Sequence, residues 1–234
     1  MTVADRWLYF PLIGLLACLG LIAQSLKTIQ LRRMLPIVFV ILTLLSVRTI
    51  VRTADWRSEL ALYSHDTPIE DNYDNEYNLG VAYSKQGFYN QALHHVQKSV
   101  KLFPYERNIL GLALIHSHLG TKEVAYQLFK DAYQARSFVP YPYRHDSLTY
   151  YYLGKALYLN NKAAEAIQII SEGLKDYPNN VDLLTIFALS EYKQLNVETA
   201  LSAANKAYEI LPTNQTLYLL NQIKQNREII IKTD

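Results

Sequence analysis

Histidines and carboxylates are the side chains of this 234-residue sequence that could perform acid–base or metal chemistry. His94 and His95 are adjacent, so on a helix their side chains would point about 100° apart, a poor geometry for one metal ion. His116 and His118, two positions apart, form an equally poor pair. The acidic residues that gather near an expected helix start, where carboxylates offset the helix dipole, are Glu70, Asp71 and Asp74. We therefore expect no catalytic residue, no metal site and no cofactor.

The motifs of common enzyme classes are also missing from the sequence. There is no glycine loop for a phosphate, no nucleophile elbow and no Cys-x-x-Cys. Cys18 is the only cysteine, which excludes an internal disulfide and a multi-cysteine zinc site. Residues 1–55 carry six basic and two acidic side chains, whereas residues 56–234 carry 17 basic and 19 acidic ones. The mild overall basicity belongs to the first segment and gives no argument for nucleic-acid binding.

The strongest pattern in the sequence is a repeat of helical pairs. Leu79, Gly80, Tyr83, Ala92 and Pro104 resemble, in type and spacing, the signature of the tetratricopeptide repeat (TPR), a helix-turn-helix unit of about 34 residues. The small residue of this signature recurs at Gly80, Ala113, Gly154 and Ala188, with two steps close to the repeat length and a longer one between them. The spacing predicts four repeats with eight helices, over residues 73–105, 106–146, 147–180 and 181–214.

The flanks of the array are predicted from composition. Residues 56–72 are interpreted as a linker, and 215–234 as a capping helix and tail with apolar residues at Leu217, Leu220 and Ile223. The long step between the second and third repeats places an insertion near 136–146, where two prolines favour an extended loop. This insertion is either a tolerated loop or a binding loop.

The TPR resemblance implies a groove lined by the first helix of each repeat, which in this family binds peptides. The groove-facing places of the family fall on Tyr77, Lys85, Leu114, His118, Tyr151, Lys155, Tyr158, Tyr192 and Lys193. Tyrosines interleaved with lysines favour an extended peptide with acidic or aromatic side chains. The alternative is that these residues are simply solvated helix faces.

Residues 1–55 are interpreted as a transmembrane hairpin. Two apolar runs, at about 7–26 and 35–51, are separated by a loop that contains Lys27, Arg32 and Arg33. The positive-inside rule puts this loop in the cytoplasm and the repeats outside it, in the periplasm, the lumen or the extracellular space. The alternatives are a cleaved signal peptide, a lipoprotein cleavage box ending at Cys18, and a buried helical hairpin of a soluble protein.

A second resemblance concerns the amino-terminal motif Ala4–Gly14 and the junction residues that follow the second apolar run. The motif, together with the junction residues Arg48, Arg52, Trp56, Glu59, Leu60 and Tyr63, resembles the late transmembrane region of polytopic C-fold glycosyltransferases with carboxy-terminal TPRs, such as the transmembrane-and-TPR protein O-mannosyltransferases. The resemblance implies that Asp5 and Arg6 lie at the membrane surface, where they either support a lipid-linked sugar site or anchor the helix. The early acidic loop that carries catalysis in that family has no counterpart here, so the resemblance implies that this chain corresponds to the non-catalytic carboxy-terminal part of such an enzyme.

The sequence therefore predicts an all-α protein with a two-helix transmembrane hairpin and a TPR α-solenoid of about four repeats and a capping helix. We expect a non-catalytic, membrane-anchored module that binds a protein or peptide and contacts membrane lipid, with a membrane glycosyltransferase as a possible partner. The alternatives are a subunit of an active glycosyltransferase that uses a lipid-linked donor and has its catalytic half on another chain, and the TPR tail of a surface-polysaccharide polymerase or ligase.

Overall fold

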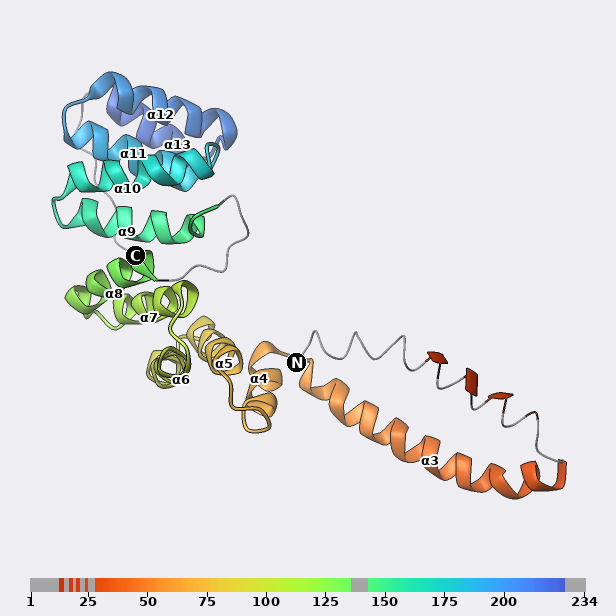
Figure 1. The fold of residues 1–234 in the computed structure, drawn as a ribbon. Helices are drawn as coiled ribbons and strands as arrows, with labels where there is room; N and C mark the ends of the chain where they lie inside the picture. Colours follow the sequence, from red (N-terminus) through yellow and green to blue (C-terminus); the bar gives the residue numbers. More distant parts are fainter. Residues whose placement is uncertain are drawn as a thin grey trace. The chain divides into compact units, whose positions relative to one another are not determined.

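The computed structural model describes residues 13–14, 17–18, 20–21, 24, 28–135 and 143–225, and within them the chain is helical with short turns. Its helices carry the labels α3 to α13 in Figure 1. The chain forms two compact units, Met1–Asp71 and Asn72–Asp234.

The first unit contains α3 (Thr28–Asp55) and α4 (Glu59–Asp66). Helix α4 lies inside the stretch interpreted as a linker, and its N-cap is Ser58, whose side chain accepts a hydrogen bond of 3.1 Å from the backbone N–H of Ala61. This capping bond replaces one of the partners that the first turn of a helix lacks. Along α3, apolar side chains such as Phe39 and Ile50 are about 70% exposed.

The predicted transmembrane hairpin is wrong. Among the helices that the structure describes, none combines the length and the apolar composition needed to cross a membrane. The expected span 35–51 lies inside α3, where Arg48 interrupts the apolar run and Pro36 stands within the helix. That run is at the short end of the lengths that span a bilayer, and the charge of Arg48 lies within it. Most of the expected first span, 7–26, lies outside the described residues.

The second unit is a stack of helix pairs, in which each helix packs against the next one along the chain. Its helices are α5 (Tyr73–Lys85), α6 (Tyr89–Leu102), α7 (Glu106–His118), α8 (Lys122–Gln134), α9 (Ser147–Leu159), α10 (Ala163–Asp176), α11 (Val181–Lys193), α12 (Val197–Ile210) and α13 (Asn214–Lys224). Odd-numbered helices are the first and even-numbered helices the second member of each pair, from α5 to α12. Helix α13 packs against α12 and α11 at the end of the array.

The turn inside each pair uses one residue with a positive φ angle. These residues are Gly87 (79°), Gly120 (78°), Asn161 (60°) and Leu195 (64°). They recur along the chain with the same three steps as the small residues of the repeat, the second step again being the longest. Glycine and asparagine tolerate this left-handed conformation well, whereas leucine does not.

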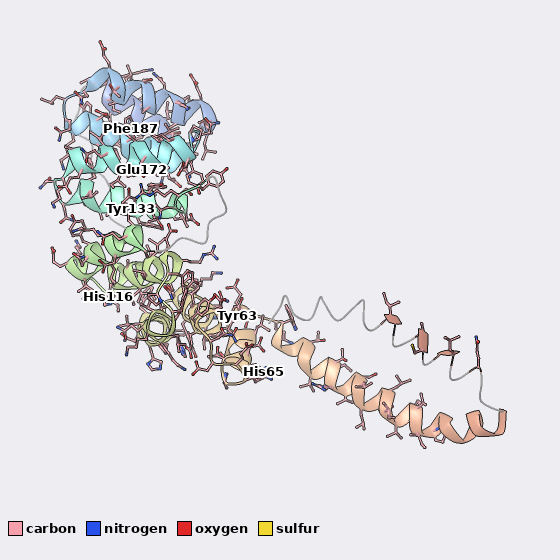
Figure 2. The ribbon with its side chains drawn as sticks, in the orientation of Figure 1. Tyr63, His65, His116, Tyr133, Glu172 and Phe187 are labelled. Carbon is pink, nitrogen blue, oxygen red and sulfur yellow. The ribbon has the colours of Figure 1, made fainter. Side chains whose placement is uncertain are left out.

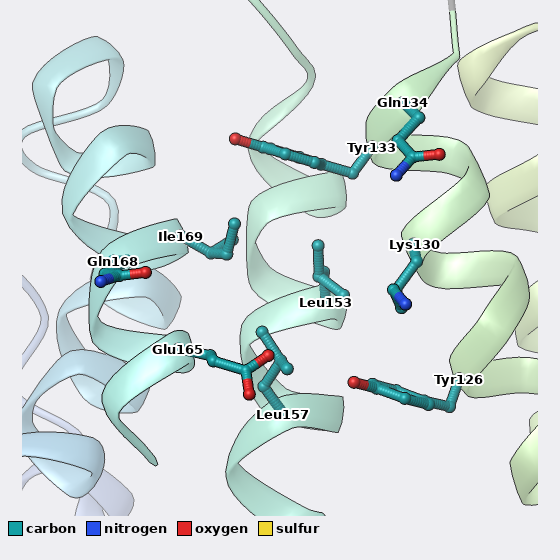
Figure 3. Close-up of a pocket in the computed structure, with 9 residues that line it drawn as sticks. All are labelled: Tyr126, Lys130, Tyr133, Gln134, Leu153, Leu157, Glu165, Gln168 and Ile169. Atoms are coloured by element: carbon teal, nitrogen blue, oxygen red, sulfur yellow. The ribbon is translucent and has the colours of Figure 1, made fainter. Parts of the chain in front are cut away.

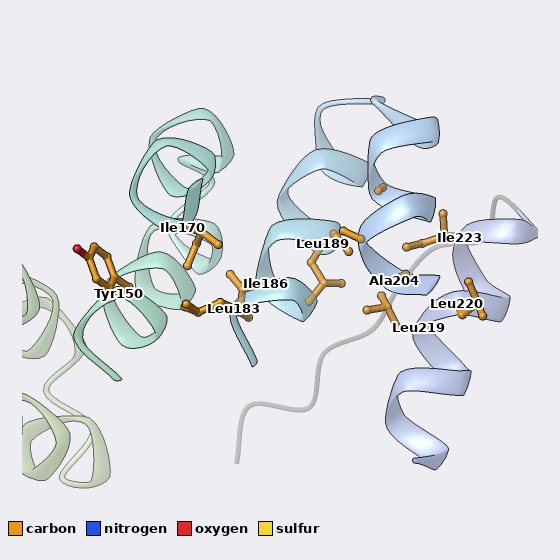
Figure 4. Packing of buried hydrophobic residues seen from close by; sticks show 12 residues of the cluster. Tyr150, Ile170, Leu183, Ile186, Leu189, Ala204, Leu219, Leu220 and Ile223 are labelled. Carbon is orange, nitrogen blue, oxygen red and sulfur yellow. The ribbon is translucent and has the colours of Figure 1, made fainter. Parts of the chain in front are cut away.

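The hydrophobic core extends along the whole stack of helices, and small residues lie where two helices approach closely. Figure 4 shows its carboxy-terminal part, in which Tyr150, Ile170 and Leu183 are fully buried. A Cβ atom on Gly173 would lie only 2.7 Å from the Tyr150 ring, so glycine is required there. In α13 the buried residues include Leu219, Leu220 and Ile223, whereas Leu217 is exposed.

Candidate binding surfaces

The structure brings four of the expected groove residues into one surface, which we call the tyrosine–lysine patch: Tyr151, Lys155 and Tyr158 of α9, and Lys193 of α11. The Nζ atom of Lys193 lies 4.6 Å from the ring centroid of Tyr158, close enough for a cation–π interaction. The same Nζ donates hydrogen bonds to Oδ1 of Asn161 (2.7 Å) and to the backbone carbonyl of Tyr158 (3.3 Å). Two neighbouring repeats therefore share this surface.

Helix geometry explains why α9 contributes three of these residues. Positions i, i+4 and i+7 of an α-helix share one face, which is the spacing of Tyr151, Lys155 and Tyr158. Lys155 Nζ lies 5.9 Å from the Tyr151 ring centroid, and the rings of Tyr151 and Tyr152 pack edge to face at 5.0 Å. The three side chains are half-buried, so they are held in place while remaining accessible.

Burial also sets the protonation state of this surface. Burial raises the pKa of the Tyr151 hydroxyl, and the nearby Asp182 carboxylate raises that pKa further. Burial likewise raises the pKa of Tyr158. Both hydroxyls are therefore neutral at physiological pH and can donate hydrogen bonds to a carboxylate.

Three other expected groove residues pack against neighbouring elements. Tyr77 of α5 lies against Gly111 of α7, where a Cβ atom would come within 2.7 Å of its ring, and burial raises its pKa. Tyr192 packs against the core cluster that contains Leu183, and Leu114 is half-buried beside the cluster of α7 and α8. These side chains join successive repeats.

The remaining expected residues are separate from the patch. Lys85 is exposed at the end of α5. His118 is exposed at the end of α7, where its ring stacks on Tyr89 at a centroid distance of 4.7 Å. Asp5 and Arg6, expected at a membrane surface, lie outside the described residues.

Two buried carboxylates were not identified from the sequence. Glu76 accepts a hydrogen bond of 2.7 Å from Lys98 Nζ and lies 2.7 Å from His95 Nδ1. Glu106 accepts a hydrogen bond of 3.0 Å from the backbone N–H of Asp146 and lies 3.3 Å from Nδ1 of the buried His145. In the sequence these carboxylates are visible only as acidic residues in the first turns of α5 and α7. Such residues indicate the start of a helix but not a buried ion pair.

A third polar group joins the carboxy-terminal side of the insertion to α8 and α10. Tyr133 of α8 donates a hydrogen bond to Glu172 of α10, and Arg144 forms an ion pair with the same carboxylate. The Arg144 guanidinium lies 5.6 Å from the Tyr133 ring centroid. Figure 2 labels Tyr133 and Glu172 within the stack. These bonds fix the chain where α9 is about to begin.

The histidines of the described helices do not form a cluster with other possible metal ligands. The rings of His94 and His95 lie edge to face with their centroids 5.2 Å apart. Within the part of the chain that the structure describes, no group of three or more histidine, cysteine, aspartate or glutamate residues is arranged to hold a metal ion. What the described surface offers is aromatic rings and ammonium groups fixed on helix faces.

The stacked helix pairs, their recurring turn residues and the terminal helix α13 define a TPR-type α-solenoid. Solved structures share this fold. MamA from Desulfovibrio magneticus RS-1 matches with a TM-score of 0.58 and 14% identity over 67% of this chain and 86% of that chain. YrrB, described as a TPR protein with an unusual peptide-binding site, matches with a TM-score of 0.56 and 18% identity over 78% of this chain and 88% of that chain.

Sequence comparison gives one further relative. The protein O-mannosyl-transferase Tmtc2 of Drosophila melanogaster is 33% identical over 106 residues, which is 44% of this chain and 11% of the fly protein. The match thus spans about a tenth of the length of that enzyme. No protein-family model matches the chain.

Proposed function

We propose that the repeat array is a protein-interaction module that binds an extended peptide with acidic and aromatic side chains across the tyrosine–lysine patch. The observation that carries the proposal is the fixed position of Lys193 above Tyr158, which joins the first helices of two repeats in one surface. YrrB, which has the same fold and a peptide-binding site, supports this class of function.

The chemistry of the patch favours acidic and aromatic groups in a partner. A lysine ammonium has three donors, and Lys193 directs two of them to Asn161 and the Tyr158 carbonyl. This arrangement holds the positive charge in place, which lowers the ordering cost when a carboxylate binds. The half-buried rings of Tyr151 and Tyr158 offer rigid apolar area for an aromatic side chain.

The test compares two peptide libraries on the purified chain. Short peptides rich in Asp, Glu, Phe and Tyr are displayed beside a library in which Lys and Arg replace the acidic residues. We expect binders only from the acidic library, with an affinity that falls as salt concentration rises. Selection of the basic library instead, or of neither library, would contradict the proposal.

A double variant then locates the binding site of a selected peptide. Lys155→Ala combined with Tyr158→Ala should weaken binding at least about tenfold in fluorescence anisotropy, because it removes an anchor ring and a charge. Lys101→Ala, which removes an exposed lysine from α6, is the matched control and should leave the affinity unchanged. An unchanged affinity of the double variant would place the peptide elsewhere.

A second candidate function follows from the match to the fly O-mannosyltransferase. In this proposal the array associates with a separate glycosyltransferase chain that transfers sugar from a lipid-linked donor. Affinity purification of the chain from its native cells, followed by mass spectrometry, should then recover a polytopic glycosyltransferase in stoichiometric amount. Recovery of the tagged chain without such an enzyme would count against this second candidate.

A further inference from the structure

A pocket of about 170 Å³ opens between α8, α9 and α10, and we call it the α8–α10 pocket. Leu153, Leu157 and Ile169 form its apolar floor, and the rings of Tyr126 and Tyr133 stand at its sides, as Figure 3 shows. Polar side chains, among them Lys130 and Glu165, lie at its rim.

The residues that line the pocket differ in type from the residues at the equivalent positions of the first repeat. In the first repeat the rings of Tyr83 and His95 stack at 5.5 Å. By the repeat spacing, the equivalent residues of the third repeat are Leu157 and Ile169, which are smaller and leave this space open.

The preceding second helix also differs, but there larger side chains replace smaller ones. Leu93 and Val100 of α6 pack into the core cluster that contains Leu112 and Ile115. The equivalent residues one repeat later are Tyr126 and Tyr133, whose rings border the pocket. The second and third repeats therefore enclose an open space where the first and second pack side chains.

Both tyrosine walls are held by other residues. The Tyr133 hydroxyl donates to Glu172, and Arg144 lies over its ring. The Tyr126 ring lies beneath two ammonium groups, Lys130 Nζ at 5.9 Å and Lys162 Nζ at 5.7 Å from its centroid. A site whose walls are fixed before binding loses little conformational entropy on binding.

Size and charge decide what the pocket can hold. An apolar cavity of about 150 Å³ binds benzene, whereas pockets for drug-sized ligands are roughly 300 Å³ or larger. The α8–α10 pocket therefore fits one side-chain ring. Lys162 has an ion pair with Glu165 at 3.5 Å, but within the described residues Lys130 forms no ion pair. The Lys130 ammonium at the rim is thus available to a carboxylate of a partner.

We propose that the α8–α10 pocket is a second docking site, which takes a phenylalanine side chain of a partner protein whose next residue is acidic. The ring enters between Tyr126 and Tyr133 and contacts the leucine floor, and the carboxylate meets Lys130. The pocket lies on a different face of α9 from the tyrosine–lysine patch, because the mean direction of Leu153 and Leu157 is about 130° around the helix from that of Tyr151 and Tyr158. Binding at one surface leaves the other accessible.

The probe is the capped dipeptide acetyl-Phe-Asp-amide, titrated into methyl-labelled protein and followed by NMR. We expect saturable shifts of the Leu153, Leu157 and Ile169 methyl signals through the ring current, with a dissociation constant on the order of 1 mM. Acetyl-Ala-Asp-amide should produce no such shifts, and acetyl-Phe-Lys-amide should bind several-fold more weakly. Absence of shifts with the Phe-Asp probe would overturn the proposal.

The decisive variant is Leu157→Tyr, which places in the pocket the residue type found at Tyr83 of the first repeat. It should weaken probe binding about tenfold or more because the added ring occupies the cavity, whereas Leu157→Met keeps the volume and should bind as the parent does. If Leu157→Tyr unfolds, Tyr126→Ala removes a half-buried wall and should cause a similar loss. A folded Leu157→Tyr or Tyr126→Ala protein with unchanged affinity would refute the site.

The double variant Lys155→Ala with Tyr158→Ala distinguishes binding at the pocket from binding at the tyrosine–lysine patch. It removes the tyrosine–lysine patch and should leave the dissociation constant of the Phe-Asp probe unchanged. A loss of probe binding in this variant would show that the probe occupies the patch and not the α8–α10 pocket.

Discussion

The junction between the first two repeats and the junction between the second and third follow one repeat pattern but bury different groups. At the first junction Leu93 and Val100 pack into a continuous apolar cluster. At the second junction tyrosines replace both residues, a pocket opens, and residues 143–146 re-enter the stack through polar contacts. At the second junction, where residues depart from the repeat pattern, Glu106 and His145 are buried together and the α8–α10 pocket is open.

The buried carboxylates of the two regions also differ, because their partners are not equally exposed. At the second junction Glu106 faces His145, and both side chains are more than 90% buried. In the first repeat Glu76 is equally buried, but the side chains of its partners His95 and Lys98 are 22% and 40% exposed. Water can replace the carboxylate for exposed partners but not for buried ones.

The largest predicted effect is therefore that of Glu106→Ala. This substitution removes the acceptor of the half-buried Asp146 N–H and the carboxylate that faces the buried His145 ring, and should reduce the free energy of unfolding by about 3 kcal/mol. Glu76→Ala should cost about 1 to 2 kcal/mol because His95 and Lys98 remain in contact with water.

Urea unfolding followed by circular dichroism measures both losses. Glu165→Ala, which removes an exposed carboxylate, is the matched control and should change the stability by less than about 0.5 kcal/mol. Equal losses for Glu106→Ala and Glu76→Ala would mean that the exposure of the partner does not decide the cost.

The sequence predicts the periodic part of this fold and fails where contacts depend on several helices at once. The regular recurrence of Gly80, Ala113, Gly154 and Ala188 locates the repeat, because the small residues and the turn residues must recur where helices approach and reverse. The pairing of Glu106 with His145 crosses the insertion, so no local spacing indicates it.

The candidate surfaces show the same limit. The family positions predict Lys155, Tyr158 and Lys193, but not that Tyr77 is used for packing against Gly111. The α8–α10 pocket depends on the relative sizes of side chains on three helices. Likewise the transmembrane interpretation rests on apolar runs and the charges between them, and none of the helices that the structure describes is long and apolar enough to cross a membrane.

Alkaline pH provides a second way to separate the junctions, because Val100 of the first junction has a tyrosine, Tyr133, at the equivalent place of the second. Burial and the hydrogen bond to Glu172 raise the pKa of Tyr133 to about 12. An unfolded tyrosine has a pKa of about 10, so the folded state binds this proton more tightly. Its contribution to stability is complete below pH 10 and is lost as the pH rises from about 10 to about 12.

Tyr133→Phe should therefore reduce the fall in stability between pH 10 and pH 12, as measured by urea unfolding at successive pH values. The same substitution should lower stability at pH 7 by about 1 kcal/mol, because Glu172 loses a hydrogen bond. Tyr218→Phe, at an exposed position of α13, serves as the control and should leave the alkaline slope unchanged. An identical slope for Tyr133→Phe would assign the alkaline transition to other tyrosines.

The smallest predicted effect concerns the turn inside each helix pair, which in the last repeat has leucine at the position with a positive φ angle. Leu195 has a φ angle of 64° and is 84% exposed, so its side chain gains little from burial while its backbone occupies a region unfavourable to leucine. Leu195→Gly should raise the free energy of unfolding by about 0.5 to 1 kcal/mol, the relief of strain exceeding the added freedom of the unfolded chain. At the equivalent turn of the second repeat, Gly120→Ala introduces a side chain at a φ angle of 78° and should lower the free energy of unfolding by about 1 kcal/mol. Thermal unfolding of both variants decides the matter: if Leu195→Gly destabilises the chain, Leu195 makes contacts in solution that offset its strained backbone.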